Sequence, residues 1–167
     1  MAMLTGYAAS HQHPFNVFVH LVGIPIIMFG VLIPLSWIGI DVRGFNINLA
    51  QAAVVAFFVF YLTLDVLFAI VFLLFAMLLA QLAGIVGAMP LKLSAAIAAA
   101  AFFGGYAAQF IGHAVERSMP VLIKHPVQAN LAAPFFQIVE IFKLLGLRDS
   151  LFSEVQRQVE AQRADQP

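Results

Sequence analysis

The chain contains no cysteine and very little charge. Of its 167 residues, 10% are charged, and the 8 basic side chains are balanced by 8 acidic ones. The missing cysteines exclude disulfides, thiolate metal sites and cysteine nucleophiles, so that any bound metal must be held by nitrogen and oxygen atoms. The absence of net positive charge argues against a nucleic-acid partner.

Apolar side chains are abundant instead. They make up 63% of the chain, against roughly 45–50% in ordinary soluble domains. Residues 1–112 hold only four charged side chains, Asp41, Arg43, Asp65 and Lys92. We therefore expect an all-α integral membrane protein that contacts the lipid bilayer: a four-span helical bundle with an interfacial helix and a C-terminal cytoplasmic amphipathic helix.

The four spans are expected at about 21–40, 49–63, 66–88 and 91–112, within a membrane catalytic domain of residues 1–147. Residues 49–89 would form a helix about 60 Å long, twice the hydrocarbon thickness, so the chain must turn back within them. We place the turn at Thr63-Leu64-Asp65, because Asp65 is the costliest of these residues to bury in a membrane. The short turn before the second span is marked by Gly44, Asn46 and Asn48. Close helix packing is expected at Gly104 and Gly105.

The last part of the chain is more polar. Gln137, Glu140 and Lys143 recur every third position, which predicts a segment at 134–147 that lies in the membrane interface or caps the bundle. Residues 148–167 are expected to form a polar C-terminal helix or tail. With four spans both termini share one side, and the positive-inside rule makes that side cytoplasmic. The basic residues expected there are Arg117, Lys124, Lys143, Arg148, Arg157 and Arg163. The membrane is expected to be a bacterial inner membrane, or the endoplasmic reticulum if the source is eukaryotic.

None of the five histidines lies in the middle of an expected span. They are His11, His13, His20, His113 and His125. Because His20 opens the first span and His113 closes the fourth, an even number of spans brings both to the same membrane surface. His13, Asn16 and His20 would share one helical face, and Gln109, His113 and Glu116 another. Imidazole and carboxylate groups in this arrangement suit iron or zinc.

Other interpretations stay open at this point. The histidines can be ordinary interfacial polar groups, which is the expectation for His13 and His125. Glu116 and Glu140 can simply pair with Arg117 and Lys143 at the surface. A zinc-dependent membrane hydrolase, a haem-binding protein and a structural or transport protein are the competing functions.

Two polar segments of the chain resemble the 2-hydroxy-fatty-acid dioxygenase family, which includes a yeast protein of phytosphingosine metabolism. The first segment places Tyr7, His11, Asn16, His20 and Pro25 in the order Y-x3-H-x4-N-x3-H-x4-P. The second segment contains QFIGHAVE at 109–116, PVL at 120–122 and APFF at 133–136, with Glu140 following. The resemblance runs from about Tyr7 to Gly146. His125 departs from it, since family members tend to have asparagine there.

The resemblance implies a non-haem Fe(II) enzyme that uses O2 to shorten a 2-hydroxy fatty acid by one carbon, which is an α-oxidation. Its implied metal ligands are His11, His20 and His113, with His125, Glu116 or Glu140 completing the set. The implied catalytic residues are His11, His20, His113 and Glu116. Contacts to the substrate are expected from Asn16, Gln109 and Glu140.

Overall fold

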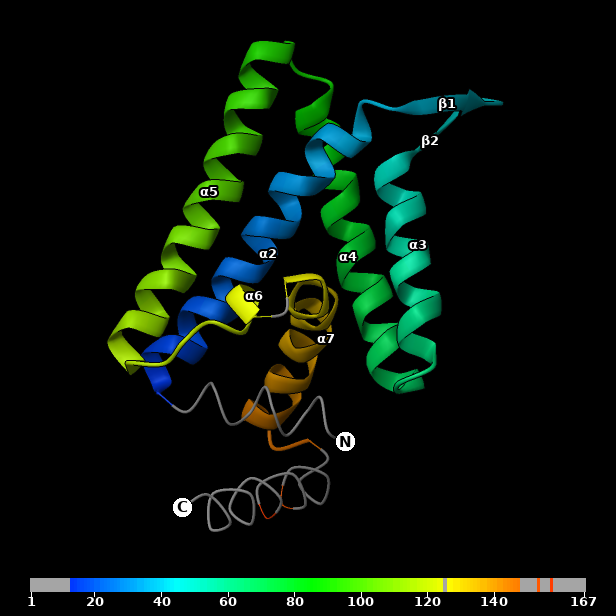
Figure 1. Ribbon diagram of the computed structural model, residues 1–167. Helices are drawn as coiled ribbons and strands as arrows, with labels where there is room; N and C mark the ends of the chain where they lie inside the picture. The colour runs from blue at the N-terminus through cyan, green and yellow to red at the C-terminus, as the bar shows by residue number, and fades with distance from the viewer. Residues whose placement is uncertain (1–12, 125, 148–152, 154–156, 158–167) are drawn as a thin grey trace. The chain divides into compact units, whose positions relative to one another are not determined.

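A computed structural model describes residues 13–124, 126–147, 153 and 157. The elements follow in the order α2 (Pro14–Ser36), β1 (Gly39–Val42), β2 (Phe45–Asn48), α3 (Leu49–Leu62), α4 (Val66–Gly87), α5 (Leu91–Glu116), α6 (Val121–Lys124) and α7 (Pro126–Leu144) (Figure 1). The chain divides into two compact units. Residues 22–108 form one, here called the central unit, and residues 1–21 with 109–167 form the other, the terminal unit.

Three helices are long and apolar enough to cross a membrane, namely α2, α4 and α5. The protein is therefore a membrane protein built on helices, as the composition predicts. The second expected span, which corresponds to α3, is apolar but has only 14 residues. At about 1.5 Å per residue it is about 21 Å long, short of the roughly 30 Å of a typical hydrocarbon core.

The expected break between the second and third spans is present. Helix α3 ends at Leu62 with Thr63 as its C-cap, and Asp65 is the N-cap of α4. The Asp65 carboxylate accepts hydrogen bonds from the backbone N–H groups of Leu67 and Phe68, at 2.9 and 3.1 Å. Close to this turn, the buried Tyr61 ring of α3 and the buried Phe72 ring of α4 pack edge to face, with centroids 4.7 Å apart. The carboxylate thus satisfies the first amides of a helix that has no charged residue of its own.

Small residues allow α2 and α5 to approach closely within the central unit. A Cβ at Gly30 would lie 2.7 Å from Phe102 N and 2.9 Å from Ala98 O, which are backbone atoms. Gly105 likewise approaches the carbonyl of Gly23, whereas nothing lies within 4 Å of a Cβ at Gly104. The close packing expected at both glycines is therefore present at Gly105 only.

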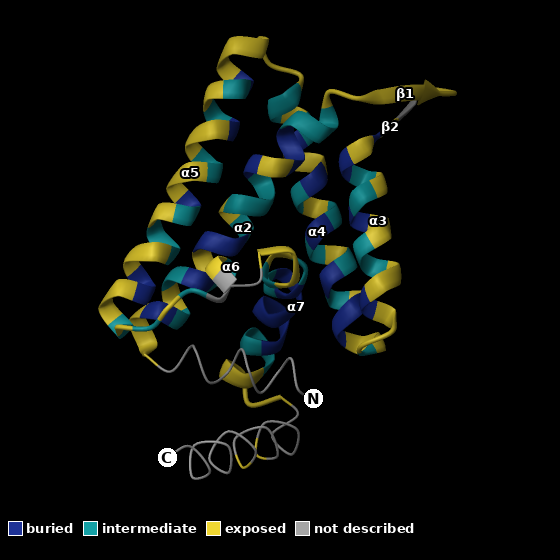
Figure 2. Ribbon diagram, viewed as in Figure 1, coloured by how far each residue is buried: buried dark blue, intermediate teal, exposed yellow. Residues whose placement is uncertain are grey.

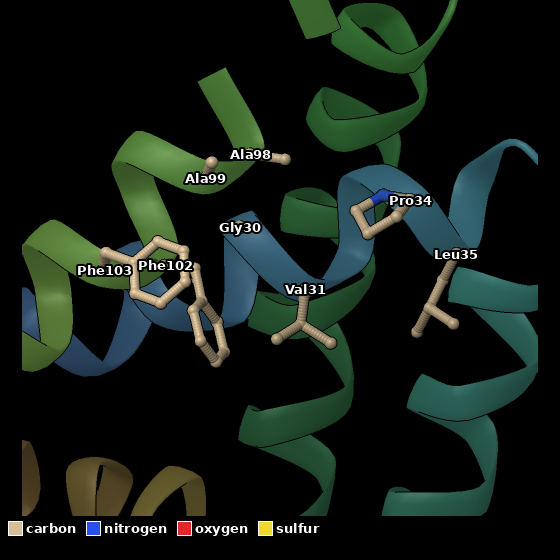
Figure 3. Close-up of a pocket in the computed structure, with 8 residues that line it drawn as sticks. All are labelled: Gly30, Val31, Pro34, Leu35, Ala98, Ala99, Phe102 and Phe103. Atoms are coloured by element: carbon tan, nitrogen blue, oxygen red, sulfur yellow. The ribbon is translucent and has the colours of Figure 1, made fainter. Parts of the chain in front are cut away.

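An open apolar groove of about 320 Å³ runs beside this contact. Figure 3 shows its lining, which comes from α2 and α5: Gly30, Val31, Pro34, Leu35, Ala98, Ala99, Phe102 and Phe103.

The first helix differs from the expected span of 21–40. It begins at Pro14 and ends at Ser36, and residues 39–48 form an antiparallel hairpin in place of a helix end and a short turn. Pro25 and Pro34 both lie inside it, as expected. The helix reaches back to Pro14 because its polar residues there are buried against the end of α5 and need no water.

In the terminal unit, α7 begins eight residues before the expected interfacial segment. Residues 134–139 are all buried, so the middle of this helix is covered on every side (Figure 2). An interfacial helix would expose one face, and that part of the expectation is not confirmed. Of the expected C-terminal helix, only Ser153 and Arg157 lie within the described residues.

Candidate functional site

His13 caps the first turn of α2. Its carbonyl accepts from the Val17 N–H at 3.1 Å, and its ring Nδ1 accepts from the Phe15 N–H at 3.2 Å. Pro14 follows as the first helical residue, where its missing N–H costs nothing. The His13 ring is thus used as a helix cap.

Glu116, the last residue of α5, binds the first turn of α2. Its Oε1 accepts from the backbone N–H of His13 at 3.2 Å, and its Oε2 accepts from Asn16 Nδ2. A carboxylate at a helix N-terminus also interacts favourably with the helix dipole. Glu116 therefore joins the start of α2 to the end of α5 through two hydrogen bonds.

Gly112 makes room for this contact. Asn16 is completely buried, and a Cβ at position 112 would collide with Asn16 Oδ1 and the Val19 side chain. Among the described residues Oδ1 has no hydrogen-bond partner, since it packs against this glycine. The sequence contained Gly112 within the QFIGHAVE segment, but nothing in the segment indicated that it faces Asn16.

His20 and His113 lie together on these helix ends. Their side chains are 7% and 5% exposed, and their ring centroids are 5.0 Å apart at an interplanar angle of 87°. The two residues are 93 positions apart in the chain. The expectation that His20 and His113 come together is thus met in the terminal unit.

The tautomer of His20 is set by the main chain. Its Nδ1 lies 2.9 Å from the backbone carbonyl oxygen of Asn16. A carbonyl oxygen can only accept, so Nδ1 carries the hydrogen, and in the neutral ring the lone pair is on Nε2. Histidines that bind metals typically donate their other ring N–H to such an acceptor.

The ring of His113 is held by the turn that ends α5. Arg117 adopts a left-handed conformation (φ 56°), and the Ser118 N–H donates to the His113 carbonyl at 3.0 Å. The Arg117 N–H bonds the Ala114 carbonyl at 3.2 Å, which completes a Schellman motif. This turn brings Ser118 Oγ to 2.8 Å from His113 Nδ1. Ser118 was not anticipated from the sequence, because its contact depends on the turn geometry.

The remaining predicted site residues are placed differently. Gln109 is partly buried one turn before His113 on α5. Glu140 forms a salt bridge of 3.1 Å with Lys143 on α7, one of the surface pairings considered from sequence. His11 and His125 lie outside the described residues.

The donor set fits a nitrogen-bound metal in part. With a metal–nitrogen bond of about 2.1 Å, two imidazoles that ligate one ion at about 100° have ring centroids about 5 Å apart, as His20 and His113 do. Within the described part of the chain, no three histidine, aspartate or glutamate side chains are grouped closely enough to hold a metal ion. The expected ligand His11 and the fourth-ligand candidate His125 lie outside that part.

A family model described as 2-hydroxy-palmitic acid dioxygenase Mpo1-like matches residues 2–144. The chain belongs to the Mpo1-like family. The match covers every described element of this Mpo1-like protein and both of its histidine-bearing helix ends. No curated protein and no solved structure matches the chain significantly.

Proposed function

We propose that this Mpo1-like protein is a non-haem Fe(II)-dependent dioxygenase that performs α-oxidation of 2-hydroxy fatty acids. The observation that carries the proposal is the buried His20–His113 pair, which lies inside the region matched by the dioxygenase family model. Paired buried imidazoles without cysteine favour a metal of the iron or zinc type, and the family favours iron.

The overall conversion needs no other co-substrate. A 2-hydroxy acid and one O2 give the acid shortened by one carbon, CO2 and water, so that atoms and electrons balance without an external reductant. Iron, when bound, would supply the activation of O2 and the chelation of the substrate's hydroxyl and carboxylate groups.

The chain's own residues would hold and orient the site. His20 and His113 are the ligands that the structure describes, and His11 and His125 are proposed to complete the set. The Asn16 carbonyl and Ser118 Oγ orient the two described rings. Glu116 acts as a positioning residue through its bonds to α2. Gln109 and Glu140 are proposed to contact the substrate's polar head.

The contacts between the helix ends also support four membrane crossings. Because Asn16 and His20 near the start of α2 contact Glu116 and His113 at the end of α5, these ends share one membrane side. The chain must then cross an even number of times, and α4 is long enough to span. Helix α3 is therefore proposed to cross as well, in a locally thinned bilayer. We propose that the shared side is cytoplasmic, in a bacterial inner membrane or the endoplasmic reticulum.

Metal analysis of detergent-purified protein tests the proposal. We expect stoichiometric iron in the wild type, lost in both His20→Ala and His113→Ala. His13→Asn is the matched control: asparagine also caps helices, so this variant should keep its iron. Oxygen-dependent loss of 2-hydroxypalmitate should follow the iron content. Stoichiometric zinc would favour a hydrolase instead, and wild type without metal would overturn the proposal.

A further inference from the structure

The hairpin between α2 and α3 has two chemically different faces. Strands β1 and β2 pair with Ile40 opposite Ile47 and Asp41 opposite Asn46. Because side chains alternate along a strand, Ile40, Val42 and Ile47 share one face, and Asp41 lies on the other. The tight turn uses positive φ at Arg43 (54°) and Gly44 (83°), and the Asp41 carboxylate accepts the Gly44 N–H at 2.9 Å. The four residue pairs of the two strands set the register, and with it the two faces.

The apolar face is uncovered within the described part of the chain. Ile40, Ile47 and Val42 are 64%, 49% and 42% exposed, and Figure 2 shows β1 as exposed throughout. An isolated two-stranded hairpin is only marginally stable in water, and exposing its apolar side chains adds to that cost. The hairpin therefore requires an apolar environment on this face.

The position of the hairpin identifies that environment. Only Trp37 and Ile38 separate β1 from the end of α2, so that the strand begins within about 11 Å of the helix end. On the other side, β2 runs directly into α3, and the Leu49 N–H bonds the Ile38 carbonyl at 2.8 Å. The hairpin is thus held at the end of a membrane-spanning helix.

The direction of the hairpin agrees with this location. Figure 1 shows β1 and β2 extending sideways from the ends of α2 and α3, across the direction of the α3 axis. A segment with this orientation at the end of a span runs along the membrane surface. The exposed Trp37 beside it is the only tryptophan of the chain, and tryptophan is enriched at membrane interfaces.

We propose that the Gly39–Asn48 hairpin lies flat in the lipid interface, with Ile40, Val42 and Ile47 in contact with acyl chains and Asp41 facing water. The exposed apolar face then continues the exposed apolar surface of the neighbouring helices, which includes Val31, Leu49 and Ile85. The occupant of the face is lipid, and the hairpin acts as a surface anchor.

The absence of cysteine makes a direct test available. Ile40→Cys and Ile47→Cys are placed in lipid nanodiscs of phosphatidylethanolamine and phosphatidylglycerol with one protein copy per disc, and their reaction with a charged maleimide is timed. Asp41→Cys is the matched control, because it changes the adjacent residue on the opposite face. We expect the two isoleucine positions to react at least tenfold more slowly than position 41.

A second measurement uses the unmodified protein. Lipids brominated near the headgroup end of their acyl chains should quench Trp37 fluorescence more strongly than an aqueous quencher does. Equal maleimide rates at positions 40, 41 and 47 would overturn the proposal. Protection found only in discs that hold two copies would also overturn it, because a second copy of the chain would then cover the face.

Discussion

Replacing Gly112 by alanine tests whether the contact between α2 and α5 builds the site. The added Cβ would meet the Val19 side chain and Asn16 Oδ1, with Asn16 Cα at 3.4 Å. Neither side chain can move easily, because valine has few rotamers and Asn16 is held by Glu116. The helices must separate, or Asn16 must leave its position.

The magnitude follows from comparison with a second glycine of the same helix. Overpacking of this kind costs about 1–3 kcal/mol, whereas alanine gains about 1 kcal/mol over glycine in a helix. Gly104→Ala should gain this helix stability without a steric cost, since its Cβ would meet nothing within 4 Å. The difference between the two variants therefore isolates the steric cost, which we expect to be about 1–3 kcal/mol.

The assay is reversible unfolding in mixed micelles, followed by circular dichroism, together with iron content. Gly112→Ala should be the less stable variant and should lose iron, because Asn16 supplies the carbonyl that orients His20. Gly104→Ala should keep its iron. If the two variants agree in stability within about 0.5 kcal/mol and in iron content, the close contact at Gly112 does not build the site.

Three further substitutions test individual contacts. Glu116→Ala removes the acceptor of the buried Asn16 amide and should lower the unfolding free energy by about 1–3 kcal/mol in the same assay. Glu116→Gln should restore part of this loss. An unchanged stability of Glu116→Ala would contradict the pairing. Ser118→Ala should weaken iron retention about 10–100-fold in competition with a chelator. The stability should be nearly unchanged, because the Schellman motif uses only main-chain hydrogen bonds. Iron retention equal to wild type would refute the role of Ser118 in orienting His113. Asp65→Ala should lower the unfolding free energy by about 1 kcal/mol, and Asp65→Asn should lower it much less. Equal losses in the two variants would show that capping by Asp65 is not the reason for the break between α3 and α4.

The helical part of the fold could be predicted because the membrane imposes simple rules on the sequence. Asp65 marked the break between α3 and α4, since a carboxylate is costly in the hydrocarbon core of a membrane and is stabilised at a helix N-terminus. The hairpin could not be predicted in the same way. Ile40 extends the apolar run of α2, and only its pairing with Ile47, seven residues later, makes it part of a sheet.

The residue types of the candidate site could be predicted from the sequence, but the contacts that hold these residues in place could not. Spacing placed His20 and His113 at helix ends, and the expectation of an even number of spans predicted that those ends come together. The start of α2 at Pro14 was missed, because Asn16 and His20 are polar and their burial depends on partners about 100 residues away. Gly112 and Ser118 were without roles in the sequence for the same reason, since both act through contacts made by the fold.

The orientation of His20 by a backbone carbonyl has a consequence for how the site can be lost. No side-chain substitution can delete that acceptor, so the ring remains set as long as the first turns of α2 stay helical. Fraying of this helix end would release the ring, and the His13 cap with its Glu116 partner opposes fraying. Linkage then requires the reciprocal effect: any ion bound by His20 must slow hydrogen exchange at the Phe15 and Val17 amides. Helix capping and the proposed binding of a metal by His20 would therefore be coupled at this end.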